Sequence, residues 1–204
     1  MTKPVKHSAI ALAILTMLYE EPMHPYRMQQ LIKERGKDEV INVAQRASLY
    51  QTINRLEREE LIQAQSVSRD ENRPERTVYE LTDRGRKTMV DWMHKILSTP
   101  SPEFPEFPAA LSVLVVIPAK DARQQLERRV AALELELKRL DGILAQTSFL
   151  PRIFVLEMEL LRANCATELK WVRSVVEDLR SGKLTWNEKW LRKMAKKFSE
   201  PPNE

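Results

Sequence analysis

Apolar residues recur every three or four positions along most of this chain, which is the spacing of one face of an α-helix. The pattern therefore predicts a mainly α-helical protein. Prolines and glycines divide the helices, since Pro22 follows the first and Gly36 the second. We expect helices over residues 8–19, 25–36, 48–62, 83–97, 109–117, 126–144, 152–181 and 184–198.

The predicted helix of residues 48–62 has two faces of different character. Its apolar stripe is formed by Leu49, Ile53 and Leu56. The opposite side carries long polar and cationic side chains, which can reach base edges and phosphates in a DNA major groove. These residues are Gln51, Asn54, Arg55 and Arg58. An ordinary solvated helix face has a similar composition, so the function of this helix depends on its neighbours.

After Ile62 the pattern changes to the alternation of a β-strand, with β-forming residues on both sides of the turn-rich segment 69–75. We predict a two-stranded hairpin with Arg69, Arg73 and Arg76 at or near its tip. On its own, a loop of mixed charge would be a solvated turn. Directly after three helices it indicates a wing that touches phosphates or the minor groove, so the fold class is a winged helix-turn-helix.

The segment STPSPEFPEFP, residues 98–108, predicts a stiff and extended connection between two domains. Its proline spacing also fits a ligand for a proline-binding groove, which we consider the weaker interpretation. The expected organisation is a DNA-binding domain over residues 1–97, a linker over 98–108, a helical domain over 109–182 and a tail over 183–204.

The helical domain contains a heptad seam in which apolar residues alternate spacings of four and three. The seam consists of Leu126, Val130, Leu133, Leu137, Leu140 and Leu144. A second apolar stripe follows in residues 152–181, so the two helices predict an α-helical hairpin or coiled coil. Together with the apolar helix 109–117 they offer more surface than one hairpin covers, and we assign the seam to a homodimer contact.

The tail, LTWNEKWLRKMAKKF, predicts a basic amphipathic helix over residues 184–198. Trp186, Trp190, Leu191, Met194 and Phe198 fall on one side, and lysines and Arg192 surround them. Such a helix can lie on a membrane or follow the DNA backbone. We favour a third interpretation, in which its aromatic side packs on the body of the protein or of a partner chain.

Composition limits the other classes of function. The 204 residues carry 33 basic and 29 acidic side chains, so the net charge of +4 does not by itself demonstrate nucleic-acid binding. The single Cys165 excludes an intramolecular disulfide, and three scattered histidines give no metal-ligand spacing. We expect no metal, no cofactor and no enzyme activity. With no apparent signal peptide or membrane-spanning stretch, we expect a cytoplasmic protein without a membrane partner.

Three motifs resemble the amino-terminal domain of the PadR transcriptional regulators. They are MHPYRMQQLI at residues 23–32, SLYQTINRLEREELI at 48–62 and RTVYELTDRGR at 76–86, and the resemblance covers about residues 8–97. The later helices agree with the helical dimerisation domain of longer members in architecture only. The resemblance implies that Ser48, Tyr50, Gln51, Asn54 and Arg55 enter the operator groove. It also implies that the Tyr50 hydroxyl and the wing arginines contact the DNA backbone.

The chain departs from the family pattern at two positions where glycine is usual. Pro25 suits a helix start, but Glu60 removes an easy left-handed cap and adds negative charge near DNA. The resemblance further implies a homodimeric repressor released from a near-palindromic operator by a small aromatic or apolar effector. Candidate effector contacts are Met89, Trp92, Met93 and Trp171, although core packing is the more common role of such residues. The alternative is an architectural or protein-interaction module that binds DNA without specificity.

Overall fold

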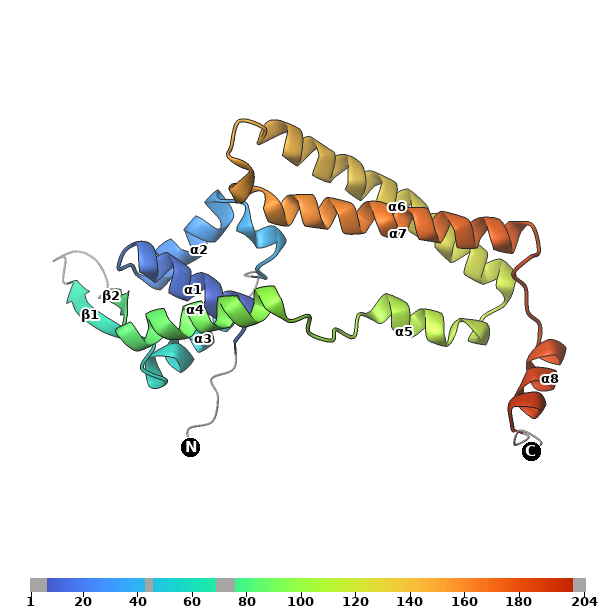
Figure 1. Ribbon diagram of the computed structural model, residues 1–204, viewed down its shortest axis with the longest axis horizontal. Helices are drawn as coiled ribbons and strands as arrows, with labels where there is room; N and C mark the ends of the chain where they lie inside the picture. Colours follow the sequence, from blue (N-terminus) through green and yellow to red (C-terminus); the bar gives the residue numbers. More distant parts are fainter. Residues whose placement is uncertain (1–6, 43–45, 69–75, 200–204) are drawn as a thin grey trace. The chain divides into compact units, whose positions relative to one another are not determined.

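The computed structural model describes residues 7–42, 46–68 and 76–199 of the chain. It divides into two compact units, residues 1–102 and 103–204, and the division falls within the proline-rich segment. The predicted fold class is confirmed, because the structure is mostly helical and contains a two-stranded antiparallel hairpin followed by further helices. Each unit is described by itself below (Figure 1).

Unit 1 contains the three helices, the hairpin and the fourth helix in the predicted order. Its elements are α1 (Ala9–Glu20), α2 (Pro25–Glu34), the 3₁₀ turn η1 (Lys37–Glu39), α3 (Arg46–Arg58), β1 (Ile62–Ser68), β2 (Arg76–Leu81) and α4 (Asp83–Ser98). Side chains cap three of the helices at their amino ends. The Ser8 hydroxyl accepts from the Ala11 N–H at 3.2 Å, and His24 Nδ1 accepts from the Arg27 N–H at 3.0 Å.

The core of unit 1 forms where α1, α2 and α3 meet. Leu49, Ile53 and Leu56 of α3 are at most 1% exposed and belong to one apolar cluster with residues of α1 and α2. Burying each such side chain stabilises the fold by about 1.5–3 kcal/mol. Tyr26, whose position in the helix pattern predicts an inward side chain, is instead 49% exposed. Because the core fixes one face of α3, it also fixes the direction of the opposite face.

Helix α3 ends at Arg58, earlier than the Ile62 end predicted from the sequence. The Leu61 N–H donates to the Leu56 carbonyl at 2.9 Å, and the Glu60 N–H donates to the Glu57 carbonyl at 2.8 Å. This pair of bonds is the Schellman cap, which requires a left-handed residue between helix and strand. Glu60 supplies it with φ of 57°, so the cap forms here without glycine.

The hairpin is confirmed as an antiparallel pair in which Ile62 faces Leu81 at the base and Ser68 faces Arg76 at the outer end. The register shifts between Ala64 and Ser66. Met23, in the segment between α1 and α2, adds a single bridge to Tyr79 through two backbone hydrogen bonds of 3.1 Å. The hairpin is thereby tied to the helices at its base.

The junction between the hairpin and α4 depends on Thr82 and Gly85. The Thr82 hydroxyl donates to the Glu60 carbonyl at 2.8 Å and accepts from the Gly85 N–H at 3.0 Å, so it joins the α3 cap to the start of α4. A Cβ placed on Gly85 would lie 2.0 Å from the Leu61 carbonyl oxygen. Only glycine allows α4 to approach the end of α3 this closely.

Unit 2 consists of an antiparallel pair of long helices with shorter elements before and after it. Its elements are α5 (Glu106–Ser112), η2 (Leu114–Val116), α6 (Ala119–Gln146), η3 (Arg152–Phe154), α7 (Leu156–Arg180) and α8 (Glu188–Ser199). In Figure 1, α6 and α7 run side by side over most of their length. Ion pairs join the two, including Arg129 to Glu168 at 2.5 Å and Arg173 to Glu134 at 2.6 Å.

Two short helices of unit 2 begin at positions other than those predicted. Helix α5 begins at Glu106, inside the segment expected to be extended. Pro108 is in its first turn, where the missing N–H removes no helical hydrogen bond. Helix α8 begins at Glu188 rather than near Leu184, because the Asn187 side chain accepts from the Trp190 N–H at 2.8 Å and caps the helix there.

The heptad seam of α6 lies against α7 of the same chain. Leu126 is 4% exposed beside Val172 and Val176, and Leu140 is 2% exposed beside Met158. Val130, Leu133, Leu137 and Leu144 are half-buried around these two clusters. The hairpin core of the same chain already buries Leu126 and Leu140, and the contact of the seam with a second chain stays a prediction. The four half-buried seam residues keep part of their surface for a partner.

Candidate nucleic-acid interface

The side of α3 that faces away from the core presents a continuous exposed stripe. Its members follow helical spacing and consist of Ala47, Tyr50, Gln51, Asn54 and Arg58. Tyr50 is 48% exposed. At a rise of about 1.5 Å per residue the stripe is roughly 16 Å long, which matches the length of about five base steps. Three of the five predicted groove residues, Tyr50, Gln51 and Asn54, are in this stripe.

Two of the predicted groove residues lie beside the stripe rather than on it. Ser48 is half-buried, and its carbonyl accepts a 2.7 Å hydrogen bond from the Thr52 hydroxyl. Arg55 is half-buried and already has an interaction within the protein. Arg58, which belongs to the polar face of the sequence pattern, is exposed in the last turn of α3. The structure therefore favours Arg58 over Arg55 as the cation that is free to meet a phosphate or a base.

Acidic residues border the carboxyl end of this stripe. Glu57 and Glu60 line a shallow groove of about 170 Å³ together with residues of β1 and Thr82. The Glu60 carboxylate pairs with Arg84 at 3.0 Å, so part of its charge is neutralised. Burial, followed by the charge of Glu57, raises the pKa of Tyr79 above its ordinary value. The part of α3 that can meet an anionic partner therefore ends at Arg58, just before Glu59.

The hairpin follows α3 directly, and the Met23 bridge joins it to the segment between α1 and α2. Arg69 and Arg73, predicted for its tip, lie outside the described residues. Arg76 is the first residue of β2 and faces Ser68 across the pair, but its side chain also lies outside the described residues. The structure thus confirms the hairpin that carries the three arginines, and the contacts of their side chains stay a prediction.

The order of these elements agrees with a known family. Residues 14–91 match the model of the transcriptional regulator PadR-like family. This part of unit 1 is similar to that family, and we refer to it as the PadR-like domain. The resemblance predicted from the sequence is thereby confirmed. The match runs from the middle of α1 to the middle of α4 and so includes the α3 stripe, the hairpin and the junction at Gly85.

Solved structures extend the likeness of fold beyond the PadR-like domain. Bacillus subtilis PadR, solved in complex with operator DNA, has a TM-score of 0.67 at 18% identity and covers 84% of this chain and 99% of its own. The same protein solved in complex with p-coumaric acid has a TM-score of 0.67 at 16% identity, with 85% and 99% covered. The Vibrio cholerae virulence activator AphA has a TM-score of 0.65 at 19% identity, with 85% and 99% covered. No curated protein matches the chain.

The candidate effector residues occupy different environments. In the PadR-like domain, Trp92 is 7% exposed within the core and contacts the His7 ring edge-on at 6.1 Å between centroids. Met89 packs against that core, whereas Met93 is 37% exposed on α4. In unit 2, Trp171 is 46% exposed and meets the Phe107 ring edge-on at 6.4 Å. Trp92 is accounted for by core packing, and Met93 and Trp171 have surface available for a ligand.

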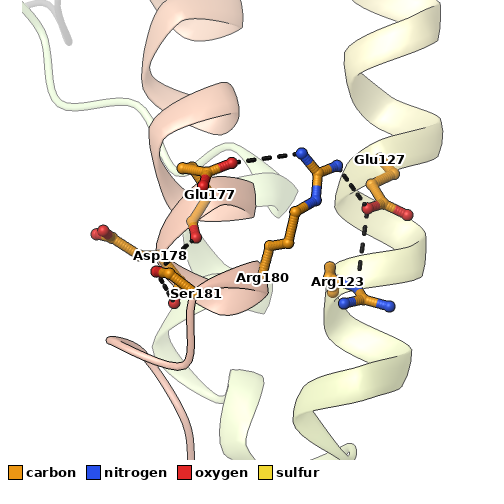
Figure 2. A network of polar contacts seen from close by, with 6 residues as sticks. All are labelled: Arg123, Glu127, Glu177, Asp178, Arg180 and Ser181. Atoms are coloured by element: carbon orange, nitrogen blue, oxygen red, sulfur yellow. Dashed lines mark hydrogen bonds and ion pairs between the residues drawn. The ribbon is translucent and has the colours of Figure 1, made fainter.

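Unit 2 also contains a groove that the sequence pattern did not indicate. It has a volume of about 450 Å³ and lies between α6 and α7, with Val130, Ala131 and Val176 among its lining residues. Figure 2 shows Arg180 reaching across it from α7, with ion pairs to Glu127 at 3.2 Å and to Glu177 at 3.3 Å. Because the residues of α6 and those of α7 are far apart in the sequence and meet only through helix pairing, a sequence pattern alone could not group them.

In the described part of the chain, no cluster of histidine, cysteine, aspartate or glutamate side chains could hold a metal ion. Cys165 is 8% exposed in the hairpin core, and burial raises the pKa of its thiol. In the same part of the chain, none of the helices is both long enough and apolar enough to cross a bilayer.

Proposed function

We propose that this protein is a homodimeric transcriptional regulator that binds a near-palindromic DNA operator in a sequence-specific manner. The observation that carries the proposal is the α3 stripe. A helix whose inner face is locked into a three-helix core presents tyrosine, amide and guanidinium groups outward, and a hairpin wing follows it at once. The PadR-like domain match and the likeness in fold to a PadR solved with operator DNA support the same function.

Each group of the interface has a distinct role in this proposal. Gln51 and Asn54 read base edges in the major groove, where an amide makes two hydrogen bonds to adenine. Ser48, the Tyr50 hydroxyl and Arg58 contact the backbone around them, with Arg55 as a second-rank candidate because of its internal partner. Arg69, Arg73 and Arg76 of the wing bind flanking phosphates, which supplies affinity and salt dependence without sequence choice.

Unit 2 supplies the dimer contact in this proposal. Exposed apolar side chains lie around the turn between α6 and α7. They are Phe149, Leu150, Ile153, Phe154, Leu156 and Leu160. Leu135 of α6 is a further case at 71% exposed. Exposed apolar surface of this extent is typical of an interface. A two-fold dimer would place two α3 helices in successive major grooves about 34 Å apart, which is why the operator should be near-palindromic.

We further propose that the dimer represses transcription and is released by a small aromatic ligand. The support is the likeness in fold to a PadR solved with p-coumaric acid, together with the available surface of Met93 and Trp171. Met89 and Trp92 would take part only if the core of the PadR-like domain opened. Quenching of tryptophan fluorescence by phenolic acids, with a parallel loss of operator affinity, is the expected result. A titration without quenching and without change in affinity would remove the effector from the proposal.

Selection of bound genomic fragments by the purified full chain tests the main proposal. Enrichment of a near-palindromic promoter site, at an affinity at least about 10³-fold above that for random DNA, is expected of a specific regulator. Uniform recovery of fragments would contradict it and favour the architectural alternative, in which DNA binding is non-specific. A reporter gene placed behind the selected site then decides the direction of control. The likeness in fold to the activator AphA makes activation the specific alternative to repression.

A further inference from the structure

Helix α8 (Glu188–Ser199) separates charge and apolar surface onto opposite sides. With 100° per residue, Trp190, Leu191 and Met194 fall within an arc of roughly 100°, and the cations occupy an opposite arc of roughly 140°. The cations are Lys189, Arg192, Lys193, Lys196 and Lys197, all exposed, and Glu188 is the single acid of the helix. The helix combines a strongly one-sided apolar stripe with low average hydrophobicity, which is typical of helices that lie in the surface of a bilayer.

The structure holds the base of α8 in place and leaves part of its apolar side uncovered, since Leu191 and Met194 are half-buried and Trp190 is exposed. Trp186, just before the helix, is half-buried, and its indole N–H donates to the Ile117 carbonyl at 2.8 Å. Trp190, one turn further on, is 45% exposed. Among the described residues, neither apolar core of unit 2 includes a side chain of α8. Trp190 therefore lies outside the apolar cores of its own chain, and the expected packing of this side on the protein or on a partner chain stays a prediction.

The charges of α8 indicate which kind of surface could cover the helix. A DNA backbone would neutralise the cations but leave Trp190, Leu191 and Met194 in water. A second copy of the chain offers the groove between α6 and α7, but its carboxylates are already paired. Arg180 bridges Glu127 and Glu177, as Figure 2 shows, and Arg173 pairs with Glu134 at 2.6 Å. A bilayer with acidic headgroups satisfies both sides of the helix at once.

We propose that α8 docks the protein onto the surface of an anionic phospholipid bilayer. The cations would lie among the headgroup phosphates, and Trp190, Leu191 and Met194 would enter the boundary with the acyl chains. Trp186 keeps the helix joined to unit 2, so docking brings the whole chain to the bilayer. This function is separate from operator binding and does not depend on it.

Sedimentation of the full chain with vesicles at 0.15 M salt tests the proposal. Vesicles of phosphatidylcholine with one quarter phosphatidylglycerol should bind the protein, whereas pure phosphatidylcholine should not. The double variant Lys193→Gln with Lys196→Gln should weaken binding by about 25-fold, because each lysine near an acidic surface contributes about five-fold. The matched control is Lys138→Gln with Lys170→Gln, which removes the same charge from exposed positions of α6 and α7 and should bind as the wild type does.

The apolar side has its own test. Trp190→Ala should weaken vesicle binding, and lipids brominated near the headgroup should quench the fluorescence of the wild type more than that of this variant. Equal loss of binding in the two lysine pairs would overturn the proposal, because the attraction would then belong to the whole protein. Unchanged vesicle binding in the α8 variants would also overturn it. If the same variants instead lose operator affinity or change the oligomeric state, α8 docks on DNA or on a second copy.

Discussion

The left-handed residue at the end of α3 gives the sharpest test of the local reasoning. Glu60 adopts φ of 57° to complete the Schellman cap, although a side chain makes this conformation unfavourable by about 1–2 kcal/mol. Replacing Glu60 by glycine removes that cost. It adds about 0.5–1 kcal/mol of entropy to the unfolded chain and loses the ion pair with Arg84, which is exposed and contributes less than about 1 kcal/mol. The net effect on wild-type stability is therefore small.

A comparison of two variants isolates the conformational part. Glu60→Ala and Glu60→Gly both lose the carboxylate, but only alanine keeps the left-handed strain. We expect the glycine variant to be more stable than the alanine variant by about 0.5–1 kcal/mol in urea unfolding of the full chain, followed by circular dichroism. The ordinary helical preference would give the opposite order, with alanine ahead by about 1 kcal/mol. Finding alanine ahead would refute the assignment of Glu60 as the cap.

Three further changes test the packing and the electrostatics of the structure. Gly85→Ala should lower the free energy of unfolding by about 3 kcal/mol or more, since its Cβ would lie 2.0 Å from the Leu61 oxygen. Gly142→Ala in α6, where a Cβ would have nothing within 4 Å, should raise it by up to about 1 kcal/mol. The urea midpoints of both variants test this, and equal shifts would contradict the close approach at Gly85. Arg35 hydrogen bonds to Glu20 at 2.7 and 2.6 Å and thereby holds the pKa of that carboxyl below its ordinary value. The stability from this pair is present above the unfolded-state pKa of Glu20 and is lost as pH falls through its folded-state pKa. Glu20→Gln should therefore make stability fall less between about pH 5 and 3. The difference should be less than about 1 kcal/mol, because the pair is exposed. An unchanged pH profile in urea unfolding would count against the pair.

The features that the sequence predicted well are those set by local pattern. The inner face of α3 was recognisable because Leu49, Ile53 and Leu56 repeat at helical spacing, so one side of the helix must be buried. The hairpin followed from alternation and a turn-rich loop. Thr82 and Pro25 are at helix starts, where their chemistry is favourable whatever the rest of the fold does.

The features that the sequence missed depend on contacts between distant segments. The partial burial of Arg55 and the exposure of Arg58 depend on how α3 packs against its neighbours, although both residues belong to one face in the sequence pattern. The seam leucines predicted a helical partner correctly, but nothing in their spacing distinguishes a partner in the same chain from one in another. The ion-pair groove between α6 and α7 likewise exists only after the hairpin forms.

The central claim is that the outward side of α3 reads the operator sequence, and Asn54 tests it most directly. The measurement is the ratio of the affinity for the selected operator to the affinity for scrambled DNA, at 0.15 M salt. It compares the wild type with Asn54→Ala and with the control Asn164→Ala, which changes an exposed asparagine of α7. We predict that Asn54→Ala lowers the ratio by about 5- to 150-fold and leaves the affinity for scrambled DNA unchanged, as expected when one bidentate base contact is lost. A ratio equal to that of the wild type and of the control would contradict the claim.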